Sequence, residues 1–334
     1  MAARGRTLCI ALLVGLSALG QQPTTSPDDV NSHPSQATRD EGKSSGQLQI
    51  GENPSASHPD VDLTAGPDGK LSQEQMQQLF RVVADKDIEN DKRQRDYTYI
   101  ERQVQHNLDS KGKIKSTEVK TYEVLEIYGE QVERLIEKDD KPLNAKEASK
   151  EEEKIQKVIE KHKNESEADR RKREEKALKE REDDRKFVRE VADAFDFKLL
   201  GTEPVAGRPA WIIDAEPHPG YQPHTREGKF LPKFHGRVWI DTSDLQLAKM
   251  DVECLDTVSW GLFLARFHKG SRFMLEQTRV NDEVWLPRRL AVEVGVRLAL
   301  VKDVNANVEQ TFRDYKKFRS SSKIVSVGEV QEPK

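Results

Sequence analysis

Three histidines and two carboxylates form the densest group of possible metal ligands in this sequence. His218, His224 and His235 lie near Asp214 and Glu216. A zinc ion needs three or four convergent ligands, usually contributed as closely spaced pairs on ordered elements. Here the histidines are six and eleven residues apart, across a proline-rich loop. The spacing does not favour a metal site, and we expect no cofactor.

A second group of acids lies beside an aromatic residue, at Trp239, Asp241 and Asp244. Both aspartates fall between two β-prone runs, and Asp side chains commonly hydrogen-bond their own backbone in turns. We therefore interpret them as turn formers. The sequence contains no His-Glu-x-x-His or P-loop pattern. Cys254 continues the alternate positions of Met250 and Val252, which predicts a packed apolar side chain. We expect a protein that is not an enzyme.

Composition and targeting signals narrow the class of protein. The net charge is −4 with 34% charged residues of both signs, which does not indicate nucleic-acid binding. Residues 1–20 have the basic start, apolar run and small residues of a cleavable secretory signal. Residues 21–70 predict a disordered linker and residues 320–334 a flexible tail. We expect a periplasmic protein with no transmembrane segment in the mature chain.

The first ordered element predicted is a helix over 72–86. Ser72 and Gln75 form a capping box, and Leu71 with Met76 a hydrophobic staple. The apolar residues at helical spacing are Met76, Leu79, Phe80 and Val83. This stripe predicts a helix that packs on a sheet.

Most of the remaining sequence predicts antiparallel strands. Runs 97–108 and 113–125 flank a Gly-containing turn, and runs 236–240 and 245–252 flank the aspartate turn. From Leu290 to Leu300, large apolar residues alternate with smaller or charged ones. About nine to eleven strands, joined mostly by turns, predict an α+β fold, an unclosed antiparallel barrel with the helix on its concave side.

A different composition interrupts the strands at 144–195. Lys, Glu, Arg and Asp dominate this stretch, and Asn164-Glu165-Ser166 divides it. We predict two charged helices that form a hairpin of coiled-coil type. This insertion is either a solvent-exposed arm or a docking arm for a protein partner.

The order of these elements resembles the bacterial outer-membrane lipoprotein-sorting proteins, the LolA/LolB-like half-barrel family. The likeness is carried by Gly-x-x-Trp-Ile-Asp at 236–241, the run 245–252, Trp285-Leu286-Pro287, and a closing strand with Tyr315 and Phe318. It covers a predicted domain of residues 71–319. The charged insertion departs from the compact carriers of this family.

The resemblance implies an apolar cavity between curved sheet and helix that binds the acyl chains of a lipid or lipoprotein without covalent chemistry. The expected lining comprises Met76, Leu79, Phe80, Val83, Trp239, Leu290, Val292, Val294, Val296 and Leu298. These apolar faces fit a filled core as well as a cavity. The alternative function is an envelope interaction or sensor module that binds a protein partner through the charged helices.

Overall fold

The computed structural model describes residues 71–260, 265–298 and 302–317. The predicted signal segment, linker and C-terminal tail lie outside these residues. Within the described part, no helix combines the length and apolar composition needed to cross a membrane.

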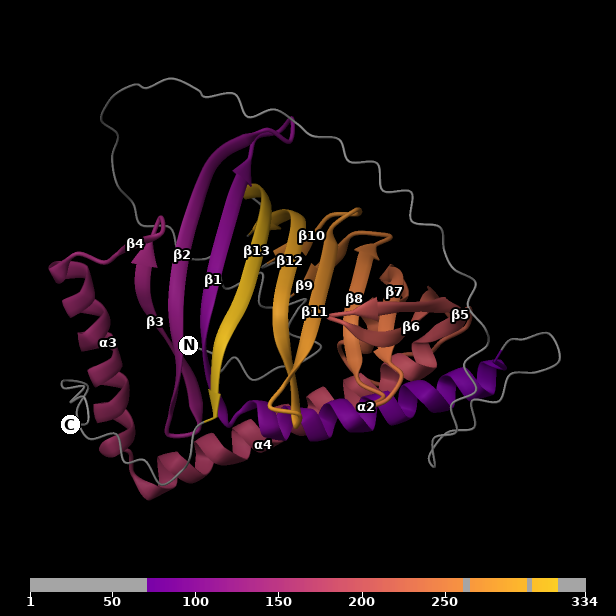
Figure 1. The fold of residues 1–334 in the computed structure, drawn as a ribbon, viewed down its shortest axis with the longest axis horizontal. Coiled ribbons are helices and arrows are strands. Elements are labelled where there is room, and N and C mark those ends of the chain that lie inside the picture. Colours follow the sequence, from indigo (N-terminus) through magenta and orange to yellow (C-terminus); the bar gives the residue numbers. More distant parts are fainter. Residues whose placement is uncertain (1–70, 261–264, 299–301, 318–334) are drawn as a thin grey trace.

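One large antiparallel sheet of 13 strands dominates the structure (Figure 1). The strands are Tyr97–Leu108 (β1), Ile114–Ile127 (β2), Glu130–Lys138 (β3), Lys141–Pro142 (β4), Phe195–Val205 (β5), Arg208–Pro217 (β6), Phe234–Asp241 (β7), Leu247–Cys254 (β8), Val258–Trp260 (β9), Ala265–Phe267 (β10), Arg272–Val280 (β11), Val284–Leu298 (β12) and Lys302–Lys317 (β13). Ten have eight or more residues. The count exceeds the predicted nine to eleven strands because β4, β9 and β10 are short pieces of only two or three residues.

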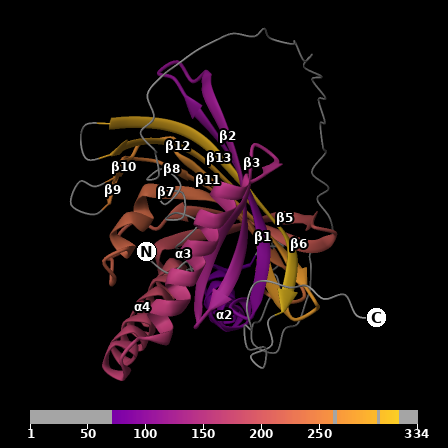
Figure 2. The same ribbon diagram turned by 90° about the vertical axis from the view of Figure 1, so that its left-hand side faces the viewer.

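The strand order is β4-β3-β2-β1-β13-β12-β11-β8-β7-β6-β5, and the described residues do not pair the two outer strands with each other. The predicted unclosed antiparallel sheet is therefore confirmed. Figure 2 shows that the strands bend along their length. Register shifts interrupt several ladders, for example between Leu199 and Gly201 and between Trp239 and Ile240. Bulges of this kind bend and twist a strand.

The helices are Gln73–Gln94 (α2), Ala145–Lys163 (α3) and Glu167–Ala194 (α4), with a 3-10 helix at Gly228–Lys233 (η1). The predicted capping box is present at the start of α2, with Ser72 and Gln75 bonded in both directions. The helix extends eight residues past its predicted end at Lys86, because Asp87 and Asn90 continue its buried side with polar residues. The charged insertion forms the two predicted helices.

Both helices of the insertion return to the body of the protein. Ile155 of α3 is buried, and α3 packs along β3. The last turns of α4 lie beside α2, where Phe187 and Ala192 are buried. Figure 1 shows α2 and α4 side by side across the lower ends of the strands.

From the sequence, the β-prone runs 260–268 and 271–280 would pair as a hairpin around Lys269 and Gly270, and this prediction is wrong. β11 and β10 do not pair with each other; both pair with the long strand β12, at Arg272–Glu293 and at Phe267–Val296. The intervening residues therefore form an irregular link within one run alongside β12. The turn signal of Lys269-Gly270 was correct, but a turn does not identify which strands pair.

One face of the sheet, which we name the helix-covered face, contains a continuous apolar row. Register places neighbours from β12 to β5 in one line, comprising Leu290, Leu275, Met250, Val238, Ile213 and Leu199. These residues belong to, or pack against, the core cluster that includes Met76, Leu79 and Phe80 of α2. The main core therefore lies between this face and the helices.

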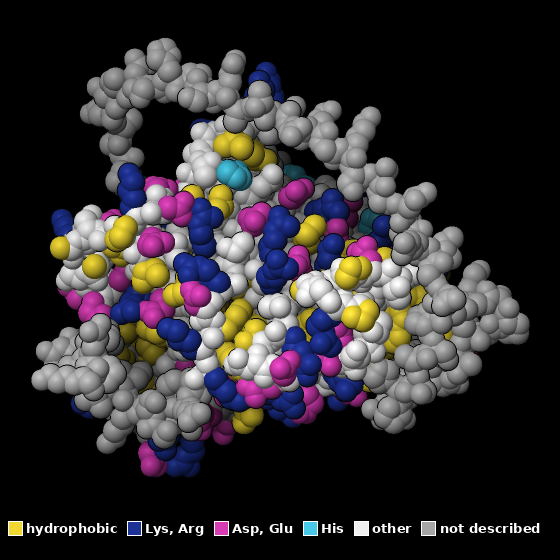
Figure 3. Space-filling view, in the orientation of Figure 1, with side chains coloured by type: hydrophobic (Ala, Val, Ile, Leu, Met, Phe, Trp, Pro, Cys, Tyr) yellow, Lys and Arg dark blue, Asp and Glu magenta, His cyan; other side chains and the backbone are white. Residues whose placement is uncertain are grey.

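The opposite face carries a smaller apolar cluster. It contains Val205, Ala210, Ile212, Trp239, Ala248 and Trp285. Around it, the strands expose mixed charges, and Figure 3 shows Lys or Arg next to Asp or Glu over this part of the molecule. Pairs such as Arg272 with Asp251 and Arg289 with Glu309 link neighbouring strands.

Gly236, the first residue of the Gly-x-x-Trp-Ile-Asp segment, has a steric role. A Cβ atom at this position would lie 2.2 Å from the carbonyl oxygen of Asp251 and 2.7 Å from the Cα of Val252. Both atoms belong to backbone of the neighbouring strand, which cannot move aside without breaking the ladder. Glycine is therefore required where β7 crosses β8.

We predict that Gly236→Ala destabilises the protein by about 1–3 kcal/mol, the usual cost of overpacking. Urea unfolding followed by tryptophan fluorescence measures the change. Gly295→Ala is the control, because its Cβ would meet side chains and no backbone, with Asn305 Oδ1 at 3.0 Å and His268 Nδ1 at 3.5 Å. Equal stability of the Gly236 variant and the native chain would contradict the steric argument.

Candidate functional site

The residues predicted to line an apolar cavity lie mainly on the helix-covered face. Eight of them, Met76, Leu79, Phe80, Val83, Leu290, Val292, Val294 and Val296, belong to one cluster and are between 0 and 7% exposed. The helix stripe and the alternating strand thus meet, as the sequence indicated. In this closed arrangement they pack as a core.

Two predicted lining residues differ from the rest. Trp239 lies on the opposite face, in the smaller cluster, so its placement in the lining is wrong. Alternation along β7 separates it from Ile240, which belongs to the main cluster. The backbone of Leu298 pairs with Ala265 and Lys302, but its side chain lies outside the described residues.

The apolar row gives way to a polar strip at its β1 end. Gln310 of β13 pairs with Leu290 on one side and with Gln103 of β1 on the other. Its amide nitrogen donates to Glu101 Oε1 at 2.6 Å and to Gln103 Oε1 at 3.3 Å. All three polar side chains are buried. One face of the sheet therefore carries apolar and polar halves side by side.

Specific contacts hold α2 in place at both ends. Near its start, the Phe80 ring stacks on Phe197 of β5 with centroids 3.7 Å apart. Near its end, Asn90 Nδ2 donates to the Trp285 carbonyl, and the Trp285 amide donates back to Asn90 Oδ1, both at 2.7 Å. The helix therefore spans from the edge strand β5 to the start of β12.

Exposed ion pairs join α2 to α4. Arg81 Nη2 lies 3.0 Å from Asp193 Oδ1, and Arg189 Nη2 lies 2.7 Å from Asp85 Oδ1. All four side chains are largely exposed, and such pairs contribute at most about 1 kcal/mol each. The two helices thus form a unit held mainly by their apolar contacts.

Asp87 is an acid on the buried side of α2. It is 4% exposed, and its Oδ1 atom has no hydrogen-bond partner. Burial, together with the nearby charge of Asp91, raises the pKa of Asp87 from 3.8 to about 7. A proton on this carboxyl therefore favours the packed position of the helix.

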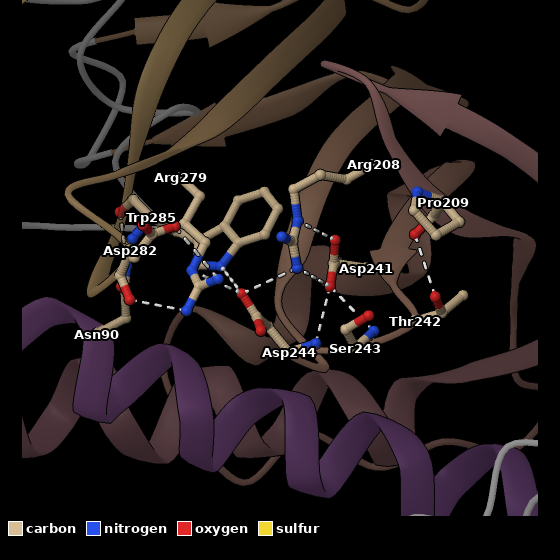
Figure 4. A network of polar contacts seen from close by, with 10 residues as sticks. All are labelled: Asn90, Arg208, Pro209, Asp241, Thr242, Ser243, Asp244, Arg279, Asp282 and Trp285. Atoms are coloured by element: carbon tan, nitrogen blue, oxygen red, sulfur yellow. Dashed lines mark hydrogen bonds and ion pairs between the residues drawn. The ribbon is translucent and has the colours of Figure 1, made fainter.

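The turn after β7 is the centre of a polar network (Figure 4). Asp241 is fully buried, and its Oδ1 accepts the backbone N–H groups of Ser243 at 3.0 Å and Asp244 at 2.7 Å. Arg208 of β6 donates two hydrogen bonds to the same carboxylate, from Nε to Oδ2 at 2.7 Å and from Nη2 to Oδ1 at 2.9 Å. The prediction that Asp241 forms a turn is confirmed.

Asp244 extends this network to β11 and β12. Its Oδ2 atom accepts the indole N–H of Trp285 at 2.9 Å and lies 3.2 Å from Arg279 Nε and 3.3 Å from Arg208 Nη2. The Arg208 guanidinium also lies over the Trp285 ring, 5.5 Å from its centroid. The network therefore fixes the end of the smaller cluster, beside Asn90 and α2.

Another buried carboxylate, Glu190 of α4, anchors the proline-rich loop. It accepts hydrogen bonds from the Tyr221 hydroxyl, the His224 amide, and the amide and hydroxyl of Thr225. Burial opposes ionisation of Glu190, but these hydrogen bonds outweigh it and lower its pKa. Burial beside this carboxylate raises the pKa of Tyr221.

The histidines of the sequence analysis do not converge. His218 Nδ1 lies 2.8 Å from Asp196 Oδ1, His235 Nδ1 lies 3.6 Å from Glu216 Oε1, and the His224 amide binds Glu190. The described residues contain no group of three or more His, Cys, Asp or Glu side chains arranged to bind a metal. Each histidine has a separate local contact.

Cys254 is buried in the main cluster, as its position in line with Met250 predicts. Burial raises the pKa of its thiol to about 12. It therefore stays protonated near neutral pH and behaves as a small apolar side chain.

Comparison with known proteins gives a fold likeness only. No family model and no curated protein matches the sequence. A solved outer membrane lipoprotein-sorting protein domain from Vibrio parahaemolyticus aligns with 72% of this chain and 95% of its own, at 11% identity and a TM-score of 0.28. A LolA superfamily protein from Nitrosomonas europaea aligns with 72% and 94%, at 10% identity and a TM-score of 0.28.

A third solved structure, a DUF1329 family protein from Desulfovibrio piger, aligns with 73% of this chain and 95% of its own, at 11% identity and a TM-score of 0.24. The descriptions of the first two structures name the same family that the sequence resembles. At these TM-scores the alignments carry no argument, and the architecture rests on the strands and helices described above.

We predict that Arg208→Met destabilises the protein by on the order of 3 kcal/mol, because it leaves the buried Asp241 charge without its partner. Urea unfolding at neutral pH measures the loss. Arg237→Met is the matched control, because Arg237 pairs with Asp214 at an exposed position and should cost less than about 1 kcal/mol. Similar losses in both variants would contradict a special role for the Arg208 pair.

We also predict that Asp87→Asn stabilises the protein at neutral pH. The raised pKa of Asp87 means that the folded state holds its proton more tightly, so native stability falls as pH rises from about 4 to 7 and then levels off. The variant lacks this loss, and its advantage should grow over that interval to at most about 4 kcal/mol.

Urea unfolding across this pH range provides the measurement. Asp183→Asn, at an exposed position of α4, is the control and should show no growing advantage. If Asp87→Asn were less stable than the native chain at every pH, the carboxyl would have an unrecognised favourable partner.

Proposed function

We propose that this protein is an exported, non-enzymatic carrier that binds an acyl chain of a lipid or lipoprotein. The binding surface would be the helix-covered face, opened by movement of α2 and α4. The observation that carries the proposal is the apolar row from Leu290 to Leu199, which crosses an open sheet and is covered mainly by two helices. The periplasm is the proposed location, reached through the signal segment 1–20.

The energetics of a lipid suit this surface. Each buried methylene contributes about 0.8 kcal/mol, so a chain of about sixteen carbons gains roughly 12 kcal/mol before costs. Part of that gain would be spent on separating the helices from the sheet. The net affinity would then be moderate, which suits a carrier that must release its cargo.

Two features of the closed state support helix movement. The buried Asp87 disfavours the packed helix when it is ionised. The ion pairs Arg81–Asp193 and Arg189–Asp85 join α2 to α4. They would stay intact if the two helices moved together. Elements that open to admit ligands usually come from the less stable parts of a fold.

The polar strip supports an amphiphile as the ligand. Gln310, Gln103 and Glu101 lie on the same face as Leu290, one or two strands further along. An acyl chain on the apolar row would place a polar headgroup beside their amide and carboxylate groups. The proposal therefore includes an orientation for the ligand.

A brominated fatty acid tests this proposal, because bromine quenches tryptophan fluorescence only near contact. The chain has four tryptophans. One variant should keep Trp211, which lies in the main cluster, and a second should keep Trp239, which lies on the opposite face. Phe replaces the other tryptophans. We expect saturable quenching of Trp211 and little quenching of Trp239.

The same fatty acid without bromine is the control for indirect changes in fluorescence, and native mass spectrometry counts the bound chains. Absence of uptake by the native protein would refute the carrier proposal. Stronger quenching of Trp239 than of Trp211 would place the chain on the wrong face.

An interaction module remains a second candidate, favoured by one observation on α4. Leu178 is 60% exposed in the middle of a helix whose neighbouring side chains are charged and largely exposed. A partner helix or strand could cover this residue together with the charges around it. This candidate predicts no uptake of fatty acid, so the quenching experiment also separates the two functions.

A further inference from the structure

The hairpin between β1 and β2 extends beyond the rest of the sheet at its outer end (Figure 1). The first five residues of β2, from Ile114 to Glu118, are all exposed, so both faces of the strand are open to solvent. Gly112 has a φ of +77° and closes the turn, with its amide donating to the Asp109 carbonyl. The tip, which we define as residues 107–117, is thus an ordered β-hairpin end that projects from the body of the protein.

This tip is positively charged on a negatively charged protein. Lys111, Lys113 and Lys115 give it three positive charges and Asp109 one negative charge, for a local net charge of +2 against −4 for the whole chain. The Asp109 carboxylate faces inward, because its Oδ1 accepts the amides of Lys111 at 2.8 Å and Lys113 at 2.9 Å. The next acid along β2, Glu118, is paired with Lys120 at 3.0 Å.

An exposed apolar side chain lies next to the lysines in the sequence of the tip. Ile114 lies between Lys113 and Lys115 and is 60% exposed, as much as any large apolar residue described in the structure. Figure 3 shows Lys or Arg side chains at the outer end of this hairpin. Strand pairing and the bond between His106 Nδ1 and Thr117 Oγ1, 2.7 Å apart, hold the tip in shape. The backbone that carries these charges is thus ordered before any partner binds.

We propose that the tip is a docking element for an anionic lipid surface. Lysine ammonium groups at the projecting end would lie among the lipid phosphates, while Ile114 enters the interface between headgroups and acyl chains. Basic residues near such a surface contribute about 1 kcal/mol each, roughly fivefold in partitioning per lysine. This proposal does not depend on the carrier function, because it uses no residue of the helix-covered face.

Vesicle cosedimentation of the purified protein tests the proposal. The probes are vesicles of phosphatidylcholine alone and of an equimolar mixture of phosphatidylcholine and phosphatidylglycerol. We expect binding to the mixed vesicles that weakens as salt is raised, and little binding to phosphatidylcholine. The triple variant Lys111→Glu, Lys113→Glu, Lys115→Glu should bind at least about a hundredfold more weakly.

The chain offers matched controls for charge and for apolar exposure. Lys172→Glu, Lys176→Glu, Lys179→Glu makes the same change of net charge on exposed positions of α4 and should retain most of the binding. Ile114→Asn should bind severalfold more weakly, whereas Leu178→Asn, which changes an equally exposed side chain, should bind like the native protein. Circular dichroism checks that each variant is folded.

Several results would overturn the proposal. They are equal binding to neutral and mixed vesicles, unchanged binding of the tip variant, and equal losses in the α4 control. Equal tip-dependent binding to soluble polyglutamate at the same charge concentration would assign the tip to acidic polypeptides instead of lipid. The acyl-chain quenching experiment reads a different face, so either proposal can fail without the other.

Discussion

The structure depends on covering one face of a sheet that does not close. In a closed barrel, each strand finds a partner and the interior is enclosed by the strands themselves. Here, among the described residues, it is mainly helices that shield the apolar row from Leu290 to Leu199 from water. The α2 helix and the last turns of α4 perform this task together.

The polar contacts act at the margins of this covered region. Asn90 fixes the end of α2 to the backbone of Trp285, and the pair of Arg208 with Asp241 fixes the neighbouring turn. Asn90, Trp285 and Asp241 are buried and Arg208 is half-buried, so these contacts define register and direction more than they add net stability. Asp87 is the exception, since a buried acid with an unbonded oxygen weakens the same helix that its neighbours hold.

Local patterns in the sequence predicted the elements well, and partner choice less well. The capping box at Ser72 and the alternation from Leu290 depend on nearest neighbours, and both match the structure. Trp239 was assigned to the wrong face because its neighbour Ile240 is equally apolar. The contact between Arg208 and Asp241 joins residues 33 positions apart, and no local spacing indicates it. No local spacing indicates the hydrogen bonds from His224 and Thr225 to Glu190 either.

Glu190 has a consequence for how the chain would move. Its carboxylate is bonded to the loop at His224 and Thr225, and a Cβ at Gly228 would lie only 2.3 Å from it, so the loop packs tightly against α4. A proline-rich connection between strands would ordinarily follow the sheet. The loop that contains His224 and Thr225 is instead fixed to α4 by these hydrogen bonds and by close packing. Any displacement of α4 would therefore pull the start of η1 and β7 with it and transmit motion of the cover into the sheet.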